Sequence, residues 1–284
     1  MSSLTAVPTR KRLACDDRLS RARQHYSECH LCEHRCGVNR LNGQRGTCKA
    51  GSVPRVFKQR IELGEEEELI PSLLFYLSGC DLRCAFCIAE ANAFDPGRGR
   101  PLTREHFRQA VLKGKAEGAR TIQWVGGEPS IHLPAILEVM AGWFGLPPVV
   151  WKSDFFATPE AMALLDGAVD VYLADLKFGN DSCARRIAGV DNYMAIVTRN
   201  LKLAAAQGEL IVRHLLLPGH LDCCFRPITE WLRSNLPGVK FSLRDGYLPS
   251  WQAQRFSELR RPLPPGEAAQ AHELAIQVGL RLIT

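Results

Sequence analysis

Residues 73–87 read LLFYLSGCDLRCAFC. An apolar, β-rich run over 73–79 leads directly into a loop with cysteines at positions 80, 84 and 87. The length and the composition of this run predict a buried β-strand. In parallel α/β sheets, ligands bind at the carboxyl ends of the strands, so the three cysteines stand where functional residues are expected.

Five further apolar runs of strand type follow along the chain, and amphipathic helical segments separate them. The six predicted strands span 73–79, 121–127, 148–156, 170–179, 209–219 and 239–249. Parallel neighbours need a helical crossover, so six strands that are each followed by a helix predict a parallel sheet. The alternation fits either an open doubly wound sheet or a partial (β/α)6 barrel.

Composition divides the 284-residue chain into a small extension and a larger core. The run GEEEEL at 64–69 is typical of a solvated connector. We therefore expect a basic N-terminal extension over 1–70 and a core domain over 71–284. Residues 1–60 hold 13 Lys and Arg against 4 Asp and Glu, which suits a solvated arm at least as well as a surface that attracts an acidic protein or a nucleic acid.

With 46% hydrophobic and 23% charged residues, the composition is that of a globular protein, and it excludes disorder, collagen and coiled coil. No apolar run approaches the roughly 18 residues that cross a bilayer. The N-terminus also lacks the apolar centre of a signal peptide. We expect a cytoplasmic protein without a membrane partner, and nucleic acid is not an expected partner either.

Eleven cysteines are many for a cytoplasmic chain, and their odd number argues against a fully paired disulfide framework. In a reducing compartment, clustered thiols indicate metal ligation. The cysteines fall into a four-residue group, a three-residue group and a remainder without a motif, which are Cys29, Cys32, Cys36 and Cys48; Cys80, Cys84 and Cys87; and Cys15, Cys183, Cys223 and Cys224. The cysteines without a motif are expected to be small core residues. The alternative is that Cys223 and Cys224 contact a substrate.

The three-residue group has the spacing C-x3-C-x2-C. Three thiolates on one loop can hold three irons of a 4Fe-4S cluster and leave the fourth iron without a protein ligand. An iron with a vacant position can bind a substrate or a cofactor, as a catalytic zinc does. The alternatives are a zinc site whose fourth ligand comes from elsewhere, or three unrelated buried thiols.

A second motif, Gly126-Gly127-Glu128-Pro129, stands at the end of the second predicted strand. Paired glycines let the backbone approach a ligand closely, and Glu128 supplies a carboxylate that could accept from an ammonium group. The alternative reading is a glycine-rich turn that only ends the strand.

The cysteine loop, with aromatic Phe86 before its last cysteine, resembles that of the radical S-adenosylmethionine (SAM) superfamily. The GGEP motif resembles the segment with which that superfamily holds the amino group of SAM. The resemblance implies a partial (β/α)6 barrel with a cysteine-rich extension. It further implies a 4Fe-4S cluster on Cys80, Cys84 and Cys87 that reductively cleaves SAM to a 5′-deoxyadenosyl radical, which abstracts hydrogen from a substrate.

Further residues resemble the branch that activates pyruvate formate-lyase. In Asp175-Leu176-Lys177 the lysine is expected in the SAM pocket, and Ser153 and Asp154 are expected near the methionyl or ribose part of SAM. Arg213 is expected to contact SAM or substrate. For His214 and His220 a packed or loop imidazole is at least as expected as catalysis, and no general base is assigned.

The four N-terminal cysteines can close a coordination shell, which suits either a structural zinc or an auxiliary iron–sulfur cluster. This segment resembles an uncharacterised subgroup labelled pyruvate formate-lyase-activating-enzyme-like. The resemblance implies an enzyme that acts on a protein or peptide and takes electrons from a flavodoxin or ferredoxin. The alternatives are radical chemistry on a small molecule, or a metal-stabilised scaffold protein.

Overall fold

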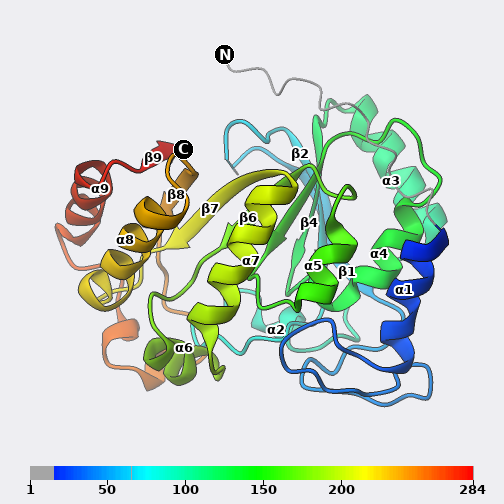
Figure 1. Cartoon of the computed structure of the whole chain (residues 1–284), viewed down its shortest axis with the longest axis horizontal. Helices are drawn as coiled ribbons and strands as arrows, with labels where there is room; N and C mark the ends of the chain where they lie inside the picture. The colour runs from blue at the N-terminus through cyan, green and yellow to red at the C-terminus, as the bar shows by residue number, and fades with distance from the viewer. Residues whose placement is uncertain (1–15, 65, 284) are drawn as a thin grey trace.

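The computed structural model of the chain describes residues 16–64 and 66–283, so Cys15 lies outside the described residues. One nine-stranded sheet with the order β3-β1-β2-β4-β5-β6-β7-β8-β9 runs through the described part (Figure 1). The parallel strands are β2 (Ser72–Leu77), β4 (Thr121–Gly126), β5 (Val149–Ser153), β6 (Val171–Asp175), β7 (Glu209–Leu215), β8 (Lys240–Arg244) and β9 (Arg281–Ile283). Antiparallel β1 (Arg55–Glu62) and β3 (Arg100–Pro101) form one edge.

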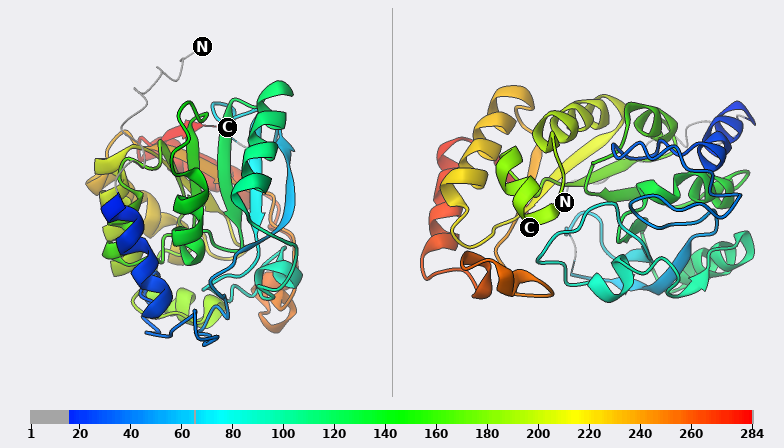
Figure 2. Two further views of the ribbon diagram at one scale, coloured as in Figure 1. Left: turned by 90° about the vertical axis from the view of Figure 1, so that its right-hand side faces the viewer. Right: turned by 90° about the horizontal axis from the view of Figure 1, so that it is seen from below.

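The parallel strands follow one another in chain order, without the reversal that marks a doubly wound sheet. The helices wrap around the outer side of the curved sheet (Figures 1 and 2), and the two edge strands do not close it. The predicted α/β fold of a partial barrel is therefore confirmed. The helices are α1 (Asp16–Ser27), α2 (Glu90–Ala93), α3 (Arg104–Ala116), α4 (Leu133–Met140), α5 (Pro159–Leu165), α6 (Asp181–Ala188), α7 (Tyr193–Gln207), α8 (Arg226–Asn235) and α9 (Glu267–Gln277).

The main core lies between the sheet and these helices, where the sequence alternation of each strand places its bulkiest side chains. Phe75 of β2 packs on Trp124 of β4 with ring centroids 4.9 Å apart, and Phe107 of α3 stacks on Trp124 at 5.3 Å. All three rings are fully buried. Such aromatic packing fixes the two strands that carry the candidate site.

The inner face of the sheet combines a small apolar cluster with buried charges. Leu69 packs there against Val150, Leu173 and Ile211. Beyond this cluster, toward the carboxyl ends of the strands, the inward positions are polar. They are Lys152, Asp175, Arg213 and Ser242.

The expectation that the run 64–69 is a solvated connector is wrong. Glu66 and Leu69 are completely buried, because this segment crosses the inner face of the sheet. The Glu66 carboxylate accepts hydrogen bonds from Ser242 Oγ at 2.9 Å and Arg244 Nη2 at 2.7 Å. Burial would raise the pKa of Glu66, but Arg213 and Arg244 hold it below its ordinary value.

The sequence also missed elements outside the six strand–helix units. Strand β1 belongs to the predicted extension but pairs with β2 of the core, and β9 adds a seventh parallel strand. The long helical run after β6 is two helices, because Gly189 ends α6 with a positive φ of 72°. The division at residue 70 remains a prediction.

Among the described residues, no helix is long and apolar enough to cross a bilayer.

Replacing Glu66 with alanine should lower the free energy of unfolding by about 3–5 kcal/mol, because Arg213 and Arg244 would keep charges without their buried partner. Denaturant unfolding of the purified chain measures this. The matched control is Glu67→Ala, at an exposed neighbour, which should change stability by less than about 0.5 kcal/mol. Equal effects of the two substitutions would contradict the buried ion pair.

Candidate active site

The three-cysteine loop leaves the carboxyl end of β2 and lies against the end of α6. The amides of Arg83 and Ala85 donate to the carbonyls of Ala188 at 3.2 Å and Ile187 at 2.8 Å. The Arg83 guanidinium also donates to the carbonyl of Cys80 at 3.1 Å. These bonds fix the backbone of the loop, in which Cys80 and Cys84 are buried and Cys87 is partly exposed.

The GGEP turn at the end of β4 is in backbone contact with the start of this loop. The amides of Gly127 and Glu128 donate to the carbonyls of Leu77 at 2.8 Å and Gly79 at 2.9 Å. A Cβ atom on Gly127 would lie 1.8 Å from the Gly79 oxygen, and Gly126 has a φ of 132°. Only glycine fits at these positions, so the two motifs form one structural unit.

Glu128 is 1% exposed and ties the end of β4 to the end of β5. Its carboxylate accepts from the amide of Ser130 at 2.8 Å, Ser153 Oγ at 2.8 Å and the amide of Asp154 at 2.9 Å. Burial, and then the charge of Asp154, raises the pKa of Glu128 to about 8. Pro129 begins the short turn that places the Ser130 amide. The structure therefore brings Ser153 and Asp154 together with GGEP.

Two more buried carboxyl groups meet beside the loop. Ligand atoms of Cys80, Asp81 and Asp154 lie within 4.8 Å of one another, and one oxygen each of Asp81 and Asp154 is buried without a hydrogen-bond partner. Burial, and then Glu128, raises the pKa of Asp81 to about 7, and burial raises that of Asp154 strongly. An organic cation placed here would stabilise these carboxylates.

Lys177 and Arg213 flank Asp175 at the ends of β6 and β7. Lys177 Nζ lies 3.0 Å from Asp175 Oδ2, and Arg213 Nε lies 3.3 Å from Asp175 Oδ1. Burial would raise the pKa of Asp175, but the two cations lower it, and Asp175 in turn raises that of Lys177 against the effect of burial. The two cations thus stay charged at the carboxyl edge of the sheet.

Two predicted residues have packing roles in this structure. The ring of Phe86 is buried and meets the rings of Phe178 and Tyr247 edge-on, at centroid distances of 6.2 and 6.4 Å. His214 is a packed imidazole whose Nδ1 lies 2.6 Å from the carbonyl oxygen of Leu176, and burial lowers its pKa to about 4.

The N-terminal cysteines lie in a loop module beside the three-cysteine loop. Arg40 Nη2 donates to Cys29 Sγ at 3.0 Å and approaches Cys48 Sγ at 3.7 Å, while Cys36 contacts Thr47. Burial raises the pKa of the Cys32 thiol well above its ordinary value. No three of the four sulfurs lie within 4.8 Å of one another, so these described residues do not form a compact single-ion site.

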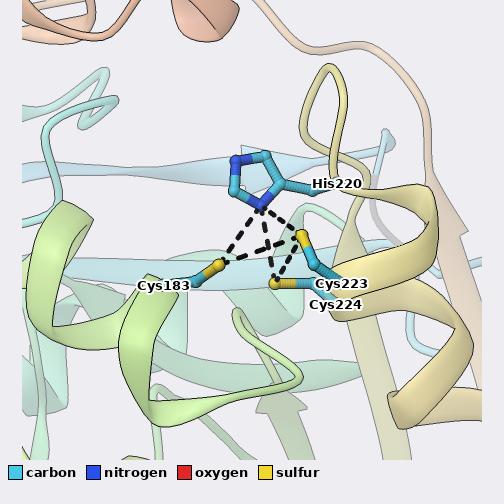
Figure 3. Close-up of side chains that lie close together, drawn as sticks. All are labelled: Cys183, His220, Cys223 and Cys224. Atoms are coloured by element: carbon cyan, nitrogen blue, oxygen red, sulfur yellow. Dashed lines mark hydrogen bonds between the residues drawn. The ribbon is translucent and has the colours of Figure 1, made fainter.

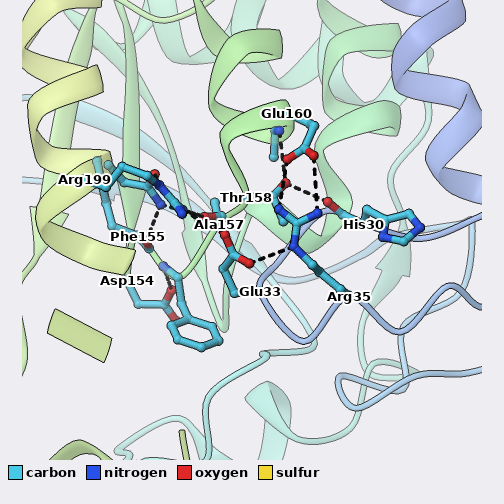
Figure 4. Close-up of polar contacts among 12 residues, drawn as sticks. His30, Glu33, Arg35, Asp154, Phe155, Ala157, Thr158, Glu160 and Arg199 are labelled. Carbon is cyan, nitrogen blue, oxygen red and sulfur yellow. Dashed lines mark hydrogen bonds and ion pairs between the residues drawn. The ribbon is translucent and has the colours of Figure 1, made fainter. Parts of the chain in front are cut away.

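This module docks on the loop after β5 that carries Asp154 (Figure 4). Glu33 bridges Arg35 and Arg199 at 2.9 Å each, and Arg35 also reaches Glu160. Thr158 Oγ1 donates to the carbonyl of His30 at 2.7 Å. The module is therefore held against the candidate site by polar contacts.

Sequence reasoning missed two residues that shape the site, Asp81 and His132. His132 is buried with its Nε2 2.6 Å from the carbonyl oxygen of Ser78, and burial lowers its pKa to about 4, so the neutral ring donates. It thereby fixes the backbone at the start of the cysteine loop. A lone histidine after a strand gives no such signal, whereas Asp81 lies inside the recognised motif.

Comparison with known proteins agrees with this geometry. The model of the Radical SAM superfamily matches residues 74–232, which contain the cysteine loop and GGEP. The chain therefore belongs to the Radical SAM superfamily. It is 36% identical over 269 residues to an uncharacterized protein of Methanocaldococcus jannaschii, covering 92% of this chain and 78% of that protein.

A further relative is the GTP 3′,8-cyclase of Aeromonas hydrophila, 24% identical over 198 residues, which are 66% of this chain and 57% of the cyclase. Among solved structures, Streptococcus suis SuiB bound to precursor peptide SuiA matches with a TM-score of 0.51 at 13% identity. That match covers 72% of this chain and 46% of SuiB, so the chain spans less than half of SuiB. It supports the fold alone.

Membership implies a 4Fe-4S cluster and SAM, and the residues at the carboxyl edge fit both. The loop offers three free thiols, those of Cys80, Cys84 and Cys87. The partnerless oxygens of Asp81 and Asp154 suit a cationic ligand, and Lys177 and Arg213 suit a carboxylate. The donor set therefore matches a zwitterionic, sulfonium-bearing cofactor.

Gly127→Ala should displace the cysteine loop, because the new methyl group would collide with the Gly79 carbonyl. We expect most of the reconstituted iron to be lost, with destabilisation of about 3 kcal/mol. Iron content after anaerobic reconstitution, together with denaturant unfolding, measures both effects. Gly64→Ala is the control, since a Cβ there meets nothing within 4 Å. Normal iron content in Gly127→Ala would contradict the contact.

Proposed function

We propose that this chain is a radical SAM enzyme that holds a 4Fe-4S cluster on Cys80, Cys84 and Cys87. It reductively cleaves SAM to a 5′-deoxyadenosyl radical, which abstracts hydrogen from a protein or peptide substrate. The observation that carries the proposal is the contact between the three-cysteine loop and the GGEP turn, which two backbone hydrogen bonds hold together. A loop that supplies three thiolates for the four irons of a cluster thus lies next to carboxylates that suit the amino group of SAM.

When bound, the cluster supplies the electron that breaks a carbon–sulfur bond of SAM, and SAM supplies the radical. The residues of the protein bind SAM and orient it. Asp154 and the GGEP backbone would bind the amino group of SAM, and Glu128 holds Asp154 and Ser153 in place. Lys177 and Arg213 would pair with the carboxylate of SAM. Because these groups are already fixed by mutual hydrogen bonds, little reorganisation is needed on binding.

Two observations support different substrates. SuiB, whose fold this chain shares, was solved with a precursor peptide. This supports a protein or peptide substrate, as in an activating enzyme. The relationship to GTP 3′,8-cyclase supports the alternative of a small molecule.

The proposed chemistry needs an outside reductant, because each reductive cleavage of SAM consumes one electron and a cluster passes electrons on without generating them. We propose a flavodoxin or ferredoxin as the electron donor. Cysteines that ligate metals must stay reduced, so a reducing compartment, the cytoplasm, is the proposed location.

Cys29, Cys32, Cys36 and Cys48 are proposed to hold a second metal group. A single tetrahedral zinc draws its four sulfurs to about 3.8 Å from one another, as its bond length of about 2.3 Å requires. Four thiolates also suit an auxiliary iron–sulfur cluster with every iron ligated, and the metal content of the chain decides between the two.

The enzyme proposal predicts that the anaerobically reconstituted, dithionite-reduced chain converts SAM to 5′-deoxyadenosine, detected by chromatography. The variant Cys80→Ala/Cys84→Ala/Cys87→Ala should form none, while keeping iron and acid-labile sulfide at the N-terminal cysteines. A fully reconstituted wild type that leaves SAM intact would support the scaffold alternative instead. If this variant contains zinc instead of residual iron, only the proposal of an auxiliary iron–sulfur cluster is contradicted.

A further inference from the structure

Three cysteines and one histidine without a sequence motif converge beside the active edge of the sheet (Figure 3). Cys183 lies in the first turn of α6, after β6. The other three, His220, Cys223 and Cys224, lie in the turn after β7 and in the single π-helical turn Leu221–Phe225 that follows it. Two loops that are about 40 residues apart in sequence thus bring four metal-ligating side chains together, with all ligand atoms within 4.8 Å of one another.

The separations match one tetrahedral ion. With zinc–sulfur and zinc–nitrogen bonds of about 2.3 and 2.0 Å, neighbouring ligands lie about 3.8 Å apart for two sulfurs and about 3.5 Å apart for sulfur and nitrogen. Here Cys223 Sγ lies 3.9 Å from Cys183 Sγ and 4.0 Å from Cys224 Sγ. His220 Nδ1 lies 3.6, 3.3 and 3.5 Å from the sulfurs of Cys183, Cys223 and Cys224.

This compactness separates the four residues from the other cysteine groups of the chain. Neither the three-cysteine loop nor the N-terminal group places three sulfurs within 4.8 Å, as far as the described residues extend. A cubane binds each thiolate at a different iron corner and keeps the sulfurs further apart. The group of Cys183, His220, Cys223 and Cys224 therefore suits a single ion rather than a cluster.

Surrounding residues orient the ligands as they do in established metal sites. The second ring nitrogen of His220, Nε2, lies 3.8 Å from Glu258 Oε1, which favours a proton on Nε2 and leaves the lone pair of Nδ1 facing the sulfurs. The Asn180 amide nitrogen lies 3.3 Å from Cys183 Sγ and 3.6 Å from Cys224 Sγ. Such N–H donors stabilise thiolates.

Three of the four proposed ligands are shielded from solvent. Cys183, Cys224 and His220 are each more than nine-tenths buried. A divalent ion would compensate the charge of thiolates at this position.

We propose that Cys183, His220, Cys223 and Cys224 bind one zinc ion as a Cys3His site. Four protein ligands close the coordination shell, so the ion has a structural role. It would clamp the loop after β6 to the turn after β7, which already touch where Gly179 meets the backbone of Cys224. Lys177 stands on the first of these loops, so the ion would hold the active edge in place. The proposal is independent of the reaction that the enzyme performs.

The test combines metal counting with zinc K-edge absorption on the full-length chain, purified under reducing conditions. We expect about one zinc per chain, with three sulfur neighbours at about 2.3 Å and one nitrogen at about 2.0 Å. Cys183→Ser/Cys224→Ser should lose this zinc. Cys36→Ser, in the N-terminal group, should keep it with an unchanged first shell. His220→Cys should keep the ion and convert the shell to four sulfurs.

Three results would overturn the proposal. The first is zinc with an unchanged shell in Cys183→Ser/Cys224→Ser. The second is iron with acid-labile sulfide that disappears in this variant, which would mean a cluster. The third is a metal-free wild type with a disulfide between Cys183 and Cys223. If the double serine variant does not accumulate, His220→Cys carries the test, since a shell that still contains nitrogen would equally overturn the site.

Discussion

The candidate site depends on the close approach of two backbones, at Gly79 after β2 and Gly127 after β4. Any side chain on Gly127 would collide with the Gly79 carbonyl, and two amide hydrogen bonds hold the contact closed. The contact fixes the entrance to the cysteine loop. It also aims Glu128 at the end of β5, where its carboxylate positions Ser153 and Asp154. Three successive strand ends are thus joined through one turn.

A second set of interactions supports this edge from inside the sheet. The buried carboxylate of Glu66 pairs with Arg244 and approaches Arg213, which pairs with Asp175, which pairs with Lys177. Opposite charges therefore alternate from the inner face of the sheet to its carboxyl edge. Since each charge is compensated, the cations can remain ionised although they are largely buried. The residues proposed to bind the cofactor are held by packing and ion pairs rather than by loops alone.

Much of the fold follows from local sequence patterns. Six strand–helix units could be predicted because apolar runs alternate with amphipathic segments, and Thr103 and Thr158 cap the helices that follow them. The site motifs could be predicted because their residues are contiguous. Glu66 could not, since its partner Arg244 is 178 residues away and a run of acids is usually solvated. The Cys183 site was missed for the same reason, because its ligands are split between two loops.

The account rests on a cluster with one iron open to SAM. Electron paramagnetic resonance of the reduced, reconstituted wild type, with and without SAM labelled with nitrogen-15 in its amino group, tests this most directly. We predict that one cluster signal shifts on addition of SAM and gains a nitrogen-15 hyperfine coupling, as expected when the amino group binds iron. Cluster signals that are identical with and without SAM would contradict it.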